Sequence, residues 1–219
     1  MLEKYAKEID RLRILAPKDK SVESMLHNLR DNPFDVAAKL SLGNLLYTFG
    51  MLQKAVEVYE QIVKEDPEAA LPYYHLGTTY YRMGRLGDAI RTLEKGFGLN
   101  KNLSMFGYWL GVANYHKGEK SKAEKYFEDL LKSSPDSKMA DYHLAILAIA
   151  KTDHKKSVEH LERLLQIDTE DTAALYHLAS AYMNLHETTK ALATLKRLLE
   201  VDPKDIRAKA LMDLMHSEA

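Results

Sequence analysis

In this 219-residue chain, the histidines are the residues whose type and spacing could support metal binding or proton transfer. Three of the nine histidines share one position of a 34-residue register with a tryptophan between them: His75, Trp109, His143 and His177. Imidazole binds metals and titrates near neutral pH. A metal site needs further ligands about 2 Å from the ion, and no carboxylate occupies a neighbouring position of the register. We therefore predict no metal site, and expect the imidazoles to hydrogen-bond a ligand's backbone, with binding that changes between about pH 5 and 7.

Other candidates for catalysis are weak. The chain has no cysteine, which excludes thiolate nucleophiles and cysteine-based zinc sites. Gly96 and Gly98 do not form a phosphate-binding loop, and acid pairs such as Glu65 and Asp66 fall at helix ends. We expect a non-enzymatic protein without a cofactor. The remaining histidines share no spacing and are predicted to be surface residues: His27, His116, His154, His160, His186 and His216.

The charge pattern argues against some classes of binding partner. Lys and Arg total 31 against 32 acids, and no run of five or six like charges occurs. We therefore expect no binding of nucleic acid and no direct insertion into a membrane. Met1 to Lys20 has no hydrophobic block typical of a signal peptide. The prediction is a cytoplasmic protein, with a processed or membrane-associated form left open.

A leucine recurs every 34 residues, and a small residue follows it each time. The leucines are Leu42, Leu76, Leu110, Leu144 and Leu178. With Val36 as position one, the leucine is position seven, a small residue falls at eight and again at twenty, and a bulky apolar residue falls at twenty-four. These positions form single faces of two successive helices. Fixed self-similarity of this length predicts a solenoid of stacked helix pairs.

The ends of the helices are also marked. Glycine at position fifteen can end the first helix in a left-handed conformation, although Thr152 and His186 replace it in the last two units. Asp35, Ser137 and Asp171 precede first helices and are predicted to be N-caps. Each unit therefore consists of a helix, a tight turn and a second helix.

This pattern resembles the tetratricopeptide repeat (TPR) over residues 36 to 205, through the small residues at eight and twenty and proline at position thirty-two. The resemblance implies an all-α fold, a right-handed α-solenoid called the TPR superhelix. Gly107 and Asp141 depart from the large aromatic that the family favours at position four. The lysine and arginine with which some members clamp a terminal carboxylate are also absent here at positions five and six.

We divide the chain by this register. A degenerate first repeat, or a helical pair that is not a repeat, comes first, and a capping helix comes last. The ranges are 1–35, 36–69, 70–103, 104–137, 138–171, 172–205 and 206–219.

The resemblance also implies that positions two, five, nine and twelve of the first helix line an inner, concave wall. Tyrosine and methionine dominate these positions, and such a wall exposes apolar area unless a partner covers it. We predict an adaptor or scaffold that binds a peptide or amphipathic helix with hydrophobic anchors. Packing within the chain is the alternative role for these rings. The candidate binding residues are Tyr74, Tyr108, Tyr142, Tyr176, Tyr81, Tyr115, Met105, Met139, His75, Trp109, His143 and His177.

A second function stays open: a scaffold that forms homo-oligomers through its terminal helices and the groove. Met212 and Met215 in the last helix, and an apolar stripe that includes Tyr5 and Ile9 near the first residue, motivate this alternative.

Overall fold

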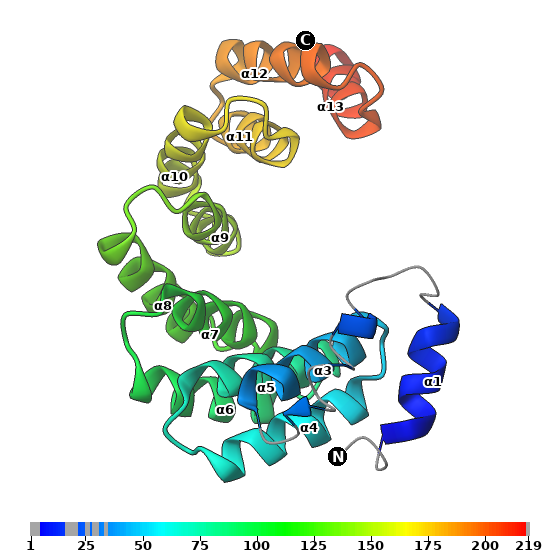
Figure 1. Cartoon of the computed structure of the whole chain (residues 1–219). Coiled ribbons are helices and arrows are strands. Elements are labelled where there is room, and N and C mark those ends of the chain that lie inside the picture. Colours follow the sequence, from blue (N-terminus) through cyan, green and yellow to red (C-terminus); the bar gives the residue numbers. More distant parts are fainter. Residues whose placement is uncertain (1–4, 16–21, 25–26, 28–30, 33–34, 218–219) are drawn as a thin grey trace. The chain divides into compact units, whose positions relative to one another are not determined.

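The computed structural model describes residues 5–15, 22–24, 27, 31–32 and 35–217, and these residues form helices and turns without a β-strand. Successive helices are joined by short turns into stacked pairs (Figure 1). The fold class is therefore all-α, as the sequence predicts. The chain divides into two compact units, Met1–Gly118 and Glu119–Ala219.

The first unit contains six described helices, and each helix from α3 to α7 packs against the next. Leu42 and Leu46 of α3 are fully buried in the core, together with Tyr59 of α4. The helices are α1 (Ala6–Leu15), α3 (Val36–Thr48), α4 (Leu52–Glu65), α5 (Ala70–Arg82), α6 (Leu86–Leu99) and α7 (Ser104–Lys117).

Close approach of paired helices explains the small residue at position eight. A Cβ atom on Gly43 would lie 2.4 Å from Cε1 of Tyr59, the bulky residue at position twenty-four of the same pair. A Cβ atom on Gly77 would lie 2.6 Å from Cγ of Leu93 in the next pair. The large side chain at position twenty-four thus occupies the space that glycine leaves.

The second unit is built in the same way. Leu161, Leu178 and Leu195 lie in one buried cluster. The helices are α8 (Lys120–Ser133), α9 (Lys138–Ile149), α10 (His154–Ile167), α11 (Thr172–Asn184), α12 (Thr188–Val201) and α13 (Ile206–Ser217).

Helix α13 covers the core of the second unit with one face. Ala208 is fully buried, and Leu211, Met212 and Met215 are partly buried against the same cluster. Asp205 precedes this helix and accepts hydrogen bonds from the backbone N–H groups of residues 207 and 208. The hydrogen bond from the Arg207 guanidinium, together with these backbone bonds, lowers the pKa of the Asp205 carboxyl to about 2. The methionine stripe therefore packs within the chain.

Side-chain caps fix the starts of several helices. The Asp35 carboxylate accepts from the N–H groups of residues 37 and 38, at 3.2 and 3.1 Å. Ser137 and Asp171 each accept from the N–H three residues later. The three predicted N-caps are confirmed, and Asp153 caps α10 in the same manner.

The turns inside the helix pairs use the left-handed backbone region. Gly50, Gly84 and Gly118 have φ angles of 76°, 74° and 87°. Thr152 and His186 adopt the same region with φ of 59°, although neither is a glycine. Left-handed φ is costly for a residue with a Cβ, and most costly for a β-branched residue such as threonine.

Thr152→Gly is therefore expected to raise the free energy of unfolding by about 1 kcal/mol, because it removes this strain. Urea unfolding followed by circular dichroism measures the change. Thr152→Ala is the control and should gain less, since it keeps the Cβ. Equal stability of the glycine and alanine variants would show that the left-handed backbone costs nothing here.

The N-terminal segment is described only in part. Tyr5, Ile9 and Val22 are buried and belong to the core of the first unit. Ser21, Met25 and Pro33, which carry the degenerate register, lie outside the described residues. The division into repeats and terminal segments at the residues given above stays a prediction.

Candidate functional site

Aromatic side chains of α3, α5 and α7 gather into one surface of the first unit, which we call the aromatic wall. Tyrosines at positions five and twelve of the register supply most of it, and each of its rings is partly exposed. The wall consists of Tyr47, Tyr74, Tyr81, Tyr108, Trp109 and Tyr115.

Trp109 connects the rings of the wall. Its Nε1–H donates a hydrogen bond to the hydroxyl of Tyr74 at 3.2 Å. Its ring centroid lies 5.2 Å from that of Tyr81 and 5.5 Å from that of Tyr108, both in edge-to-face geometry. Such contacts hold aromatic rings in defined orientations. Trp109 therefore holds the rings of Tyr74, Tyr81 and Tyr108 together at the centre of the wall.

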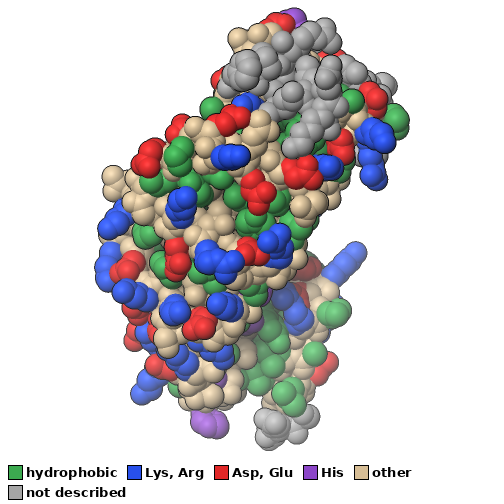
Figure 2. All heavy atoms as spheres, turned by 90° about the horizontal axis from the view of Figure 1, so that it is seen from below, with side chains coloured by type: hydrophobic (Ala, Val, Ile, Leu, Met, Phe, Trp, Pro, Cys, Tyr) green, Lys and Arg blue, Asp and Glu red, His purple; other side chains and the backbone are tan. Residues whose placement is uncertain are grey.

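The charge on this surface comes from its edge. The Arg82 guanidinium lies 4.7 Å from the ring centroid of Tyr47 and donates to the Tyr47 carbonyl at 2.8 Å. His116 is exposed and packs edge-to-face on Tyr81 at 5.7 Å. The residues of the wall itself are uncharged at neutral pH. On the face seen in Figure 2, acidic and basic side chains are interspersed with apolar ones.

Burial affects the hydroxyl groups of the wall. It raises the pKa of both Tyr81 and Tyr108 above the usual value for tyrosine. These hydroxyls therefore stay protonated through neutral and mildly alkaline pH, so each can donate a hydrogen bond to a carbonyl oxygen.

The imidazoles at position six pack on the preceding helix pair. His75 stacks on Tyr59, with centroids 5.5 Å apart and an interplanar angle of 16°. His143 stacks on Phe127 at 4.7 Å and 7°. Both histidines are half-buried, so packing against the core takes up one face of each ring. Contact with a ligand's backbone would use only the remaining exposed edge.

The second unit carries a shorter strip of the same kind. The hydroxyl of Tyr142 lies 3.5 Å from Nε2 of His177, and the Arg207 guanidinium lies 4.9 Å from the ring centroid of Tyr176. Arg207 of α13 thus covers part of the Tyr176 ring. Met139 is 52% exposed, and Met105 in the first unit is half-buried.

Protonation of His75 and His177 is expected to destabilise the fold. Burial lowers the pKa of both imidazoles, and Arg207 lowers that of His177 further. Each neutral imidazole stabilises the fold fully above its unfolded pKa of about 6.5, and this stabilisation is lost as the pH falls toward the lowered folded value. The urea midpoint should therefore fall from pH 7.5 to pH 5.5, roughly the range in which these imidazoles become charged.

The matched variants separate this effect from other titrations. His75→Phe with His177→Phe should show a smaller fall in midpoint than the wild-type chain. His27→Gln changes an imidazole whose side chain is 72% exposed and should leave the fall unchanged. An identical fall in the double variant would contradict the assignment.

A buried polar cluster in the second unit was not foreseen. Asp141 of α9 is fully buried, and its Oδ1 lies 2.8 Å from Nδ1 of His160. Nε of Arg163 lies 3.6 Å from Oδ2 of the same carboxyl. The prediction that His160 is a surface residue is wrong, because its side chain is only 13% exposed and contacts this carboxyl. The unusual Asp141 at position four was the signal available in the sequence.

The described residues hold no group of three or more histidine or acidic side chains that could bind a metal ion. None of their helices is both long and apolar enough to cross a bilayer.

Models of known protein families match successive segments of the chain. Models described as "Tetratricopeptide repeat" match residues 74–138, 118–172 and 148–214, and a model described as "TPR repeat" matches residues 43–84. Comparison with curated proteins gave no match.

Solved structures match the chain over most of its length. MamA is 26% identical with a TM-score of 0.70, over 77% of this chain and 92% of that one. YrrB, described as a TPR protein with an unusual peptide-binding site, is 18% identical with a TM-score of 0.71, over 86% and 97%. PilW, described as a type IV pilus biogenesis factor, is 15% identical with a TM-score of 0.76, over 87% and 88%. The repeat models and these folds agree, and the chain belongs to the tetratricopeptide repeat family.

Proposed function

We propose that this protein is an adaptor whose aromatic wall binds a peptide segment or amphipathic helix with hydrophobic anchors. Repeats of this family form protein-interaction scaffolds and are typically non-enzymatic. The observation that carries the finer proposal is that the wall's rings remain partly exposed after they have packed against one another.

The chemistry of the wall favours such a segment. Connected rings present rigid apolar area, so an incoming side chain loses solvent contact while the wall loses little conformational entropy. The hydroxyl of Tyr81 supplies a donor for a ligand's carbonyl group. Tyrosine and tryptophan contribute most of the binding energy at many interfaces.

The strip of the second unit supports the same proposal less strongly. Met139 is exposed and adapts to irregular apolar side chains. Tyr176 lies partly beneath Arg207, so a ligand there would meet a cation as well as a ring. We therefore place the main anchors on the aromatic wall, and treat Tyr142, His143, Tyr176 and His177 as secondary contacts.

A parallel affinity purification tests the proposal. Wild-type protein and Tyr81→Ala with Tyr108→Ala are used as baits, and the bound segment of any partner retained only by the wild type is mapped with overlapping peptides. A mapped segment with apolar anchors supports the adaptor function. Equal retention of every partner by both baits would refute it.

Self-assembly is the alternative function. Ile206 is 80% exposed and Leu214 47% exposed on α13, which leaves apolar area outside the packed methionine stripe. A molar mass that stays that of one chain across a wide concentration range in light scattering would exclude it.

A further inference from the structure

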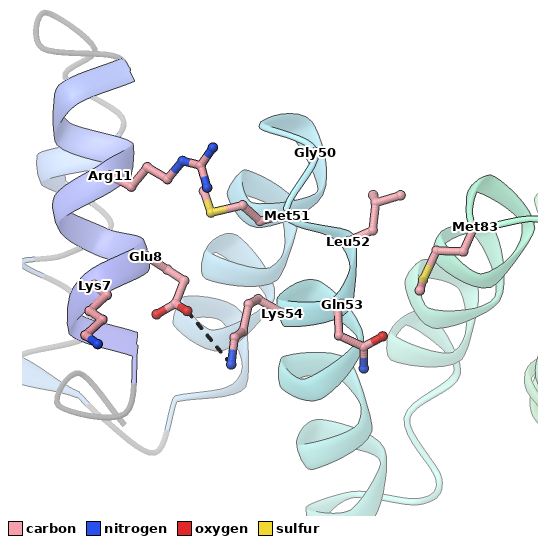
Figure 3. Close-up of a pocket in the computed structure, with 9 residues that line it drawn as sticks. All are labelled: Lys7, Glu8, Arg11, Gly50, Met51, Leu52, Gln53, Lys54 and Met83. Atoms are coloured by element: carbon pink, nitrogen blue, oxygen red, sulfur yellow. Dashed lines mark ion pairs between the residues drawn. The ribbon is translucent and has the colours of Figure 1, made fainter.

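A cleft of about 550 Å³ lies between α1 and the turn that joins α3 to α4. Figure 3 shows Glu8 and Arg11 extending from α1 toward the first turn of α4. Met83, just after α5, closes the far side. None of the residues that line this cleft belongs to the aromatic wall, so it is a separate surface of the first unit.

The charges around the cleft are unbalanced. Three lining side chains are cationic, and Glu8 is the single carboxylate among them. Nζ of Lys54 lies 3.8 Å from Glu8 and 3.2 Å from Glu57, so acids of the protein already neutralise this cation. With Glu8 and Glu57 counted against the three cations, the cleft keeps a net charge of +1, and among the described residues Lys7 and Arg11 are the lining cations without an ion pair.

Lys7 and Arg11 carry like charges on the same helix. Both are exposed, and they lie one helical turn apart on α1, where like charges repel. Among the described residues, neither has an ion-pair partner. A carboxylate placed between them would relieve this repulsion and would form charge-assisted hydrogen bonds with both.

The floor of the cleft is apolar. Met51, Leu52 and Met83 line it and are half-buried, so they keep apolar surface open to a ligand. Methionine side chains adjust to ligands of varied shape. The volume lies within the range of ligand pockets and exceeds what one carboxylate requires.

We propose that this cleft is a second docking site, for an acidic peptide segment in which carboxylates flank an apolar anchor. The anchor packs on Met51, Leu52 and Met83, and the flanking carboxylates pair with Lys7 and Arg11. Two neighbouring cations match a few carboxylates rather than a nucleic acid, whose binding requires a longer basic surface. The site does not depend on binding at the aromatic wall.

Fluorescence anisotropy with three labelled synthetic peptides of equal length tests the proposal on the full chain. The first alternates glutamate with leucine, the second replaces leucine by serine, and the third replaces glutamate by lysine. The wild-type chain should bind the first peptide at least tenfold more tightly than either of the others. Equal binding of the serine peptide would reduce the site to a non-specific charge contact and overturn the proposal, as would absence of binding.

Charge reversal tests the two cations. Lys7→Glu with Arg11→Glu should weaken binding of the acidic peptide at least tenfold and strengthen binding of the lysine peptide. Lys120→Glu with Lys125→Glu is the control, because it makes the same change in net charge at exposed positions of α8. Wild-type affinity in the first variant, or an equal loss in the control, would contradict the site.

A variant on the opposite side of the cleft distinguishes a direct loss of peptide binding from a change in the folding of α1. Gln53→Glu adds a negative charge at an exposed lining residue of α4 and should also weaken the acidic peptide severalfold. Tyr81→Ala with Tyr108→Ala should leave this binding unchanged, which separates failure of the cleft from failure of the aromatic wall. Loss of binding in the tyrosine variant but not in the Gln53 variant would place the peptide on the wall and overturn the proposal.

Discussion

His160→Ala is expected to lower the free energy of unfolding by about 1–3 kcal/mol, the range for leaving a buried polar group without its hydrogen-bond partner. The Asp141 carboxyl is fully buried, and among the described residues its Oδ2 has no hydrogen-bond partner. The hydrogen bond that Oδ1 accepts from Nδ1 of His160 is therefore its principal compensation for leaving water. Nε of Arg163 is 3.6 Å away, too far to replace that bond. Urea unfolding measures the loss.

Two further variants define the cause. Glu159→Ala changes an exposed neighbour on α10 and should alter stability by less than about 0.5 kcal/mol. Asp141→Leu with His160→Leu should recover most of the loss, because an apolar pair removes the buried polar atoms. Leu175 is buried at the same register position one repeat later, so this position accommodates leucine. A loss in His160→Ala no larger than in Glu159→Ala would show that the carboxyl is solvated.

Tyr81→Ala with Tyr108→Ala is expected to weaken binding of the mapped partner segment about 100-fold, or about 2.7 kcal/mol. Both rings contact Trp109 and are partly exposed, so they combine fixed orientation with available surface. Truncation of two such aromatic anchors commonly costs this much. Isothermal titration calorimetry with the mapped segment measures the change.

The control for this prediction is Tyr126→Ala, which truncates a half-buried tyrosine of α8 outside the wall. It should leave affinity within about twofold of wild type, since most residues outside such anchors contribute little. Thermal melting must remain cooperative in all variants. A loss confined to melting temperature, with affinity unchanged, would assign the tyrosines to packing alone.

Local sequence patterns predicted the helix pairs because helix caps and turn residues interact with backbone groups only a few residues away. Asp35 lies next to the N–H groups that it caps, and Gly84 supplies the positive φ that ends α5. Gly43 faces Tyr59 because a fixed repeat length brings positions eight and twenty-four together in each pair. These relations depend on helix geometry and are visible in spacing.

The surroundings of individual polar residues were harder to predict. His160 looks like an isolated surface histidine in the sequence, since it lies 19 positions after Asp141. Thr152 stands at the glycine position of the register, and the compact turn between α9 and α10 imposes a left-handed backbone that a β-branched residue does not favour by itself. In both cases tertiary packing outweighs the residue's own preference.

The sequence by itself determined the family, the helix pairs and the residue types at positions five and twelve of each first helix, because a 34-residue period repeats the same local interactions. Only the tertiary structure decided how much of each ring stays exposed. Stacking buries one face of His75, while Arg207 of another helix covers part of Tyr176. It also placed Lys7 and Arg11 across from Met51, since that cleft depends on how α1 packs and not on the repeat. The exposure of a side chain and the pairing of its charge depend on contacts between helices. The spacing of residues within a single helix does not reveal these contacts.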